Sequence, residues 1–157
     1  MPNLIIPSVV RSLHNIFTSI WIGGMLVMVI SFLPTLRKEI KDVELQGSVI
    51  DKVMSRHSKW VYLGIVVLAG TGMLMARLSG QTSGFFNFAN PYATILSIKH
   101  ALVLLIAVIA IVRSIAFKNA SSSKDKSKKK ISMALLMVNT FLGIVILILS
   151  SIITVIG

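Results

Sequence analysis

Four long blocks of apolar residues, separated by polar segments, set the pattern of this chain. The blocks cover about residues 7–33, 59–77, 91–117 and 131–156. Each block can cross a bilayer as an α-helix, which needs about 20 apolar residues at a rise of ~1.5 Å per residue. Apolar residues fill the blocks continuously instead of alternating or forming a single helical stripe. The pattern predicts an all-α integral membrane protein: a four-transmembrane-helix bundle that forms a single domain over residues 1–157.

The polar segments between the blocks differ in charge. Residues 35–59 hold six basic and four acidic side chains, and the Lys-rich linker 118–130 holds six lysines, whereas residues 78–90 hold no basic residue. Because basic loops stay on the cytoplasmic side, both basic segments are predicted to be cytoplasmic and both termini outside. Apolar residues recur at helical spacing within 35–58. This indicates a cytoplasmic amphipathic helix that either lies on the membrane or extends the second span.

Composition agrees with a membrane protein. The chain is 55% hydrophobic and 13% charged, and this charged fraction is about half that of soluble domains. It has no cysteine, which excludes disulfides and thiolate metal sites. The formal net charge of +11 is concentrated in the two cytoplasmic segments. Topology and anionic lipid explain it better than nucleic acid does, so the expected partner is the lipid bilayer.

Two histidines lie at matching depths in separate spans. His14 is 7 residues from Pro7 and His100 is 9 residues from Pro91, so their predicted depths differ by only about 3 Å. Histidines on facing helices of a bundle can hold a shared ligand. Lys99 precedes His100 inside the third span, where a lysine costs about 3 kcal/mol and is a functional candidate by default. We therefore expect a cofactor site in the outer half of the bundle.

The first candidate cofactor is a copper ion. Met73 and Met75 approach the same outer level from the second span. Imidazole with thioether suits copper, and methionine favours Cu(I). The predicted metal ligands are His14 and His100, assisted by Met73 or Met75. His57 lies near the opposite face and is a further candidate metal ligand.

The alternative cofactor is haem b, held between the same two imidazoles. Arg11 precedes His14 by three residues and therefore shares its helix face. Arg11 and Lys99 would then pair with the haem propionates. In this interpretation the chain is a bis-histidine electron-transfer protein.

The sequence contains no constellation typical of catalysis. The spans hold no pair of carboxylates, no nucleophile–base arrangement and no phosphate-binding loop. We predict no catalytic residues, and any redox chemistry would come from a bound cofactor. A third hypothesis is an accessory subunit of a larger membrane redox or metal-handling complex.

Three short stretches, in their order and spacing, resemble the copper resistance protein D (CopD) family of membrane proteins. They span about residues 10–117 and are Leu13-His14 with Trp21-Ile22-Gly23-Gly24, Arg56-His57-Ser58 with Thr71-Gly72, and Asn90-Pro91-Tyr92 with Ile98-Lys99. The resemblance implies a helical bundle in the cytoplasmic (plasma) membrane with a role in copper uptake or homeostasis. The chain is similar, more distantly, to small membrane haem proteins such as the membrane-embedded protoporphyrinogen oxidase type, which would point to His14 and Lys99. The motif of that enzyme around the first helix is absent beyond the histidine, so its activity is not predicted.

Overall fold

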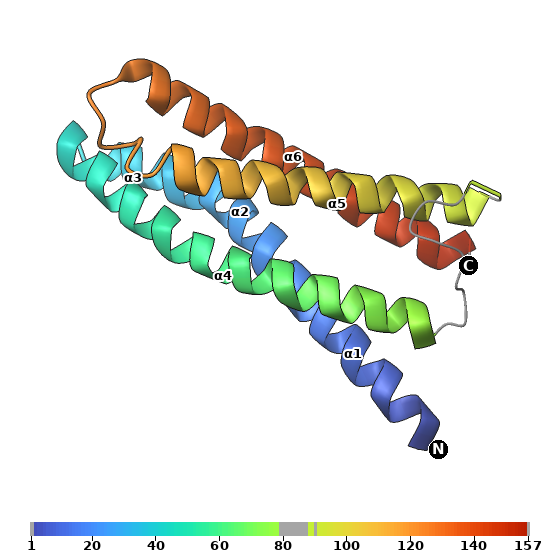
Figure 1. Cartoon of the computed structure of the whole chain (residues 1–157). Coiled ribbons are helices and arrows are strands. Elements are labelled where there is room, and N and C mark those ends of the chain that lie inside the picture. The colour runs from blue at the N-terminus through green and yellow to red at the C-terminus, as the bar shows by residue number, and fades with distance from the viewer. Residues whose placement is uncertain (1, 79–87, 90, 157) are drawn as a thin grey trace.

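The computed structural model consists of four long helical rods, each antiparallel to the one before it in the chain (Figure 1). The structure describes residues 2–78, 88, 89 and 91–156. The first rod contains α1 (Pro2–Thr18), the π-helical turn η1 (Ser19–Gly23), α2 (Gly24–Val27), a second π-helical turn η2 (Met28–Phe32) and α3 (Leu33–Glu39). The other three rods are α4 (Val43–Leu78), α5 (Pro91–Ala116) and α6 (Lys126–Ile156).

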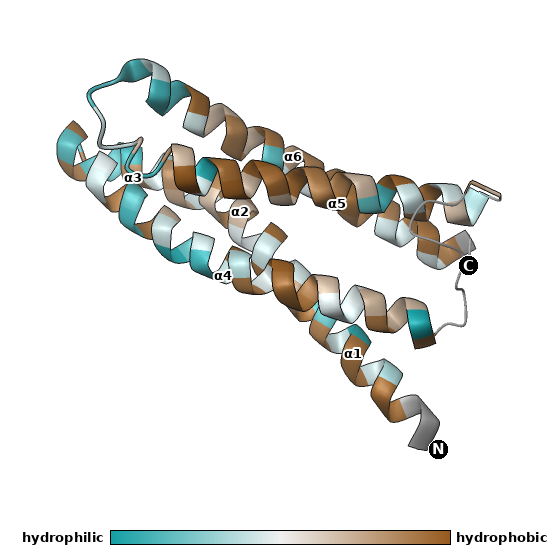
Figure 2. Ribbon diagram, viewed as in Figure 1, coloured by the Kyte–Doolittle hydropathy of each residue, from teal (hydrophilic) through white to brown (hydrophobic). Residues whose placement is uncertain are grey.

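All four rods are long and apolar enough to cross a membrane. The predicted all-α, four-span architecture is therefore confirmed, and the chain is a multi-pass membrane protein. Large apolar side chains point outward along the rods; Ile30 and Val66, for example, are each 70% exposed. Figure 2 shows hydrophobic residues along the middle of the bundle and hydrophilic residues gathered at one end. Such a surface suits contact with lipid.

The two ends of the bundle differ. We call the end formed by residues 35–59 and 118–130 the Lys-rich end. Both chain termini lie at the opposite end (Figure 1), as an even number of antiparallel spans requires, and we call it the terminal end. The assignment of the terminal end to the outside stays a prediction from loop charge.

The first apolar block ends at about residue 33, just before Pro34, but the first rod continues past this proline. Proline lacks an N–H and clashes with the carbonyl four residues earlier in a regular α-helix. Here η2 precedes the proline, and the N–H of Leu33 bonds the carbonyl oxygen of Met28, five residues back. The wider turn accommodates Pro34, and the helix continues to Glu39.

The amphipathic segment extends the second span. The backbone leaves the helix at Ile40, which has φ −103° and ψ 107°. Asp42 then accepts hydrogen bonds from the N–H groups of Glu44 (2.9 Å) and Leu45 (3.1 Å), which is a typical N-cap. From Val43 the helix runs without a break to Leu78.

The first rod pairs with α4 in an antiparallel register that can be followed along the bundle. His14 contacts Thr71 near the terminal end. Gly64 faces Phe17 and Trp21, and its lack of a side chain allows the two helices to approach closely. Helices α5 and α6 form the second closely packed pair.

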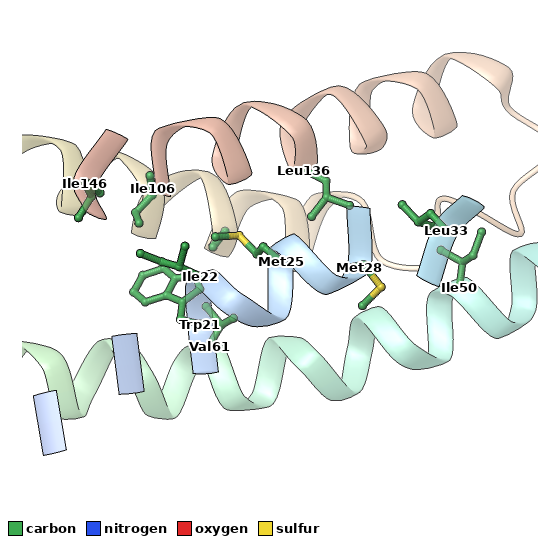
Figure 3. Packing of buried hydrophobic residues seen from close by; sticks show 11 residues of the cluster. Trp21, Ile22, Met25, Met28, Leu33, Ile50, Val61, Ile106, Leu136 and Ile146 are labelled. Atoms are coloured by element: carbon green, nitrogen blue, oxygen red, sulfur yellow. The ribbon is translucent and has the colours of Figure 1, made fainter. Parts of the chain in front are cut away.

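The core joins the two pairs (Figure 3). Trp21 faces α4, whereas its neighbour Ile22 lies against Gly143 of α6, where an added Cβ would be 3.1 Å from the Ile22 Cγ2. The first rod therefore lies between α4 and α6. The cluster of buried apolar residues consists of Trp21, Ile22, Met25, Met28, Leu33, Ile50, Val61, Ile106, Ala110, Leu136 and Ile146.

The turn between α5 and α6 is held against α4 by a carboxylate. Asp51 accepts hydrogen bonds from the N–H groups of Ser121 (3.0 Å) and Ser122 (2.8 Å) and from the Ser122 hydroxyl (2.6 Å). Asn119 enters the turn with φ 58°. One helical turn before Asp51, Gly47 touches the carbonyl oxygen of Ser121, and an added Cβ would lie 2.8 Å from the carbonyl carbon of Ser121.

We predict that Gly47→Ala lowers the free energy of unfolding by about 1–3 kcal/mol, because the new methyl group meets backbone that cannot rotate away. Gly70→Ala is the matched control: it lies on the same helix and has nothing within 4 Å of an added Cβ. That control should be neutral or stabilising by about 0.5–1 kcal/mol. Thermal unfolding of the two variants in detergent measures the difference. Equal unfolding temperatures for the two variants would show that the close approach of Gly47 to Ser121 does not contribute to stability.

Candidate metal or cofactor site

His14 is anchored by a hydroxyl from the neighbouring helix. Its Nδ1 lies 2.9 Å from the Thr71 Oγ1, and its half-buried ring lies over Gly72, where an added Cβ would be 4.0 Å from the ring Cε1. The antiparallel pairing of α1 with α4 brings these residues together, although 57 positions separate them in sequence. The ring of His14 is therefore positioned by α4 as well as by its own helix.

The Thr71 hydroxyl also determines which nitrogen of His14 carries the proton. Thr71 donates its own hydrogen to the carbonyl oxygen of Val67, 2.7 Å away. Its oxygen is then an acceptor, so His14 must donate from Nδ1–H. This tautomer leaves Nε2 with its lone pair. A metal-binding histidine is typically held in this way, with one nitrogen hydrogen-bonded and the other available.

The third rod brings two more groups to His14. Lys99 and His100 of α5 are close enough to interact electrostatically with the His14 imidazole. Both are half-buried. The structure thus places three of the residues singled out from the sequence, His14, Lys99 and His100, in one group between α1, α4 and α5. We call it the His14 group.

The His14 group carries positive charge without a nearby acid. All five acidic residues of the chain lie at positions 39–51 or at 125, at the Lys-rich end. Among the described residues, therefore, no acidic side chain faces Lys99. A half-buried ammonium needs a counter-charge, polar contacts or deprotonation, so the group favours a ligand that can neutralise Lys99 or a Lys99 that is itself neutral.

The other predicted residues at this end are placed less favourably. Met75 is partly buried and lies one helical turn beyond Thr71, on the same face of α4. Met73 lies about 160° around the helix from Thr71 and is 55% exposed. Arg11 is exposed, one turn before His14.

His57 lies elsewhere, about 21 Å along α4 from Thr71 at the helical rise of ~1.5 Å per residue. Its ring packs directly on Gly24, where an added Cβ would be 2.5 Å from Cε1 and 3.0 Å from Nδ1. Its Nε2 is buried and has no hydrogen-bond partner among the described residues. Arg113 interacts with it electrostatically. The structure therefore separates His57 from the His14 group.

The His14 group is not a preformed cage of hard ligands. Among the described residues, no set of three or more His, Cys, Asp or Glu side chains is arranged to hold a metal ion. A metal at His14 and His100 would need further donors, such as thioether sulfur, backbone carbonyl or water.

A match to a known protein family identifies the family of this chain. The family model described as copper resistance protein D matches residues 51–153, which is well over half of the sequence. The chain belongs to the CopD family. No curated protein and no solved structure matches it. The match includes most of α4, all of α5 and most of α6. It therefore contains His57, Lys99 and His100, while His14 lies before it.

Two contacts of the histidines in this CopD family member cannot be predicted from its sequence. Thr71 appeared only as part of a resemblance, and no spacing rule links it to His14 across 57 positions. Gly24 likewise appeared only as part of that resemblance, and its partner, the His57 ring, cannot be identified without the register of the first rod on α4. A polar threonine inside an apolar span was the available signal.

We predict that Gly24→Ala lowers the free energy of unfolding by about 1–3 kcal/mol, because its methyl group collides with the His57 ring. Gly23→Ala is the matched control, since nothing lies within 4 Å of an added Cβ there. In a His57→Ala background the effect of Gly24→Ala should shrink by at least ~1 kcal/mol, which a double-mutant cycle of unfolding measures. A cost that does not depend on His57 would rule out the direct contact.

Proposed function

We propose that this protein handles copper in the membrane, with His14 and His100 as the ligands of a copper ion in uptake or homeostasis. The observation that carries the proposal is the hydrogen bond from His14 Nδ1 to Thr71, which leaves Nε2 as a ligand atom. Membership of the CopD family supports the choice of copper. The electrostatic interaction of the His14 imidazole with His100 supports their acting together.

The donor set fits the reduced ion best. Imidazoles bind copper well, and thioether sulfur favours Cu(I). Met75 can approach from the face of α4 that carries Thr71, so it is the preferred third ligand, ahead of the more exposed Met73. Cu(I) carries a single charge and is repelled less by Lys99 than a divalent ion. The ion is cargo here, and the residues bind it near the terminal end of the bundle.

A second candidate function is electron transfer through haem b, and Lys99 favours it. No acidic side chain in the described residues neutralises that ammonium, whereas a haem propionate would. When bound between His14 and His100, haem b supplies one-electron redox chemistry. The chain's own residues would then hold the iron through two imidazoles, with Lys99 and Arg11 for the propionates.

Metal analysis together with a visible spectrum of the purified protein separates these functions. For copper handling we expect about one copper per chain after loading with Cu(I), and at least a tenfold loss of affinity in His14→Ala and in His100→Ala. His57→Ala, the remaining histidine of the chain, is the matched control and should bind as the wild type does.

Each other outcome has a distinct meaning. A Soret band lost in His14→Ala and His100→Ala would replace copper with haem b. Equal loss of copper in His57→Ala would show that the ion does not sit at the His14 group. A protein without metal or haem that co-purifies with a membrane complex would be an accessory subunit.

We also predict that Thr71→Val lowers Cu(I) affinity about ten- to a hundredfold, because it removes the acceptor that fixes the His14 tautomer while keeping the side-chain shape. Thr71→Ser keeps the acceptor and should stay within a few-fold of the wild type. Competition with a colorimetric Cu(I) chelator measures both. Equal affinities in the two variants would show that the hydroxyl does not orient the ligand.

A further inference from the structure

A polar pocket opens between α4, α5 and α6 at the Lys-rich end, far from the His14 group. Its volume is about 230 Å³, against roughly 30 Å³ for one water in the liquid, so it can hold a group of phosphate size with some water. We call it the Arg113 pocket. Its charged and hydroxyl-bearing lining residues are Asp51, Ser55, Ser58, Lys59, Tyr62, Arg113, Ser114, Lys118, Ser121, Lys129 and Ser132.

Arg113 is the charged residue of this lining that is buried. Its side chain is only 8% exposed. One of its terminal nitrogens, Nη1, donates to the sulfur of Met54 at 3.1 Å, a weak acceptor. Its Nε–H is buried without a hydrogen-bond partner among the described residues. A buried guanidinium is costly when it lacks an anion and matched acceptors.

Asp51, the acidic residue of the pocket lining, already has hydrogen-bond partners. Both carboxylate oxygens of Asp51 accept hydrogen bonds from the turn residues Ser121 and Ser122, at 2.6 to 3.0 Å. That leaves Arg113 without a carboxylate partner in the described chain. Three lysines share the lining, so four cationic side chains surround one carboxylate that already has partners.

Ser114 contributes a hydroxyl to the same lining. Tyr62 donates to the Ser114 Oγ at 2.7 Å. With its oxygen occupied as an acceptor, Ser114 keeps its own hydrogen to donate, and it adjoins Arg113 in the chain. A buried guanidinium, a donor hydroxyl and mobile lysines are the groups that recognise phosphate.

We propose that the Arg113 pocket binds a phosphate group. Two sources carry this chemistry: the headgroup of an anionic phospholipid and free inorganic phosphate. Basic pockets between transmembrane helices suit lipid headgroups, and this one lies where the apolar spans meet the basic segments. The site is independent of the proposed copper ligands.

The test uses the full-length protein with two probes. In nanodiscs of phosphatidylcholine mixed with phosphatidylglycerol, native mass spectrometry counts the anionic lipids retained by the protein. In neutral, phosphate-free detergent, calorimetry measures the binding of inorganic phosphate. Retained phosphatidylglycerol identifies the lipid as the source, and saturable binding of phosphate alone identifies the free anion.

For whichever probe binds, Arg113→Gln should lower affinity at least tenfold. The double variant Lys118→Gln/Lys129→Gln leaves the buried arginine in place, so it tests the pocket without disturbing the core, and it should lose affinity about three- to tenfold. Arg56→Gln is the matched control: the same change of charge on an exposed residue of α4 outside the pocket, with affinity unchanged. If neither probe binds the wild type, or if Arg56→Gln loses as much as the pocket variants, the proposal is overturned.

Discussion

The antiparallel contact between the first rod and α4 is the interaction on which the rest of this structure depends. In lipid there is little hydrophobic force between helices, so association rests on close packing and a few polar contacts. Here Gly64 allows Trp21 to approach, and Gly24 leaves room for the His57 ring. Thr71 accepts a hydrogen bond from His14. One register produces all three contacts. The ring that we propose as a copper ligand is therefore oriented by the same pairing that holds the two helices together.

Much of the fold follows from the pattern of apolar blocks, because a bilayer permits few alternatives to spanning helices. The apolar pattern does not predict that the first rod continues beyond Pro34, because a proline inside a helix usually breaks it. Five residues advance a regular α-helix by about 500°, leaving Leu33 about 140° from Met28. The π-helical turn instead joins the Leu33 N–H to the Met28 carbonyl and brings both side chains into one core. Hydropathy cannot reveal such a turn, because it changes the geometry and not the composition.

The candidate site was predictable in part, for a similar reason. Counting residues from Pro7 and Pro91 gives depth along each helix, and in the structure His14 interacts electrostatically with Lys99 and His100. Depth says nothing of rotation about the helix axis, which sets whether a side chain meets its neighbour. The rotation of α4 about its axis leaves Met73 exposed and Met75 partly buried. It also directs Thr71 toward His14. It follows from packing among four helices, which no single-helix pattern contains.

Two cationic side chains, the half-buried Lys99 and the buried Arg113, lie at opposite ends of the bundle, and neither is neutralised by an acidic side chain within the described chain. The acids are confined to the Lys-rich end, where Asp51 is committed to holding the turn before α6. A cation in such a position needs a counter-charge, polar contacts or, for Lys99, deprotonation. Lys99 adjoins His100, one of the proposed copper ligands, and Arg113 lines the proposed phosphate pocket. Apolar side chains would pack at both positions without the cost of burying a charge, and a bound phosphate would give Arg113 an anion, as a haem propionate would give Lys99.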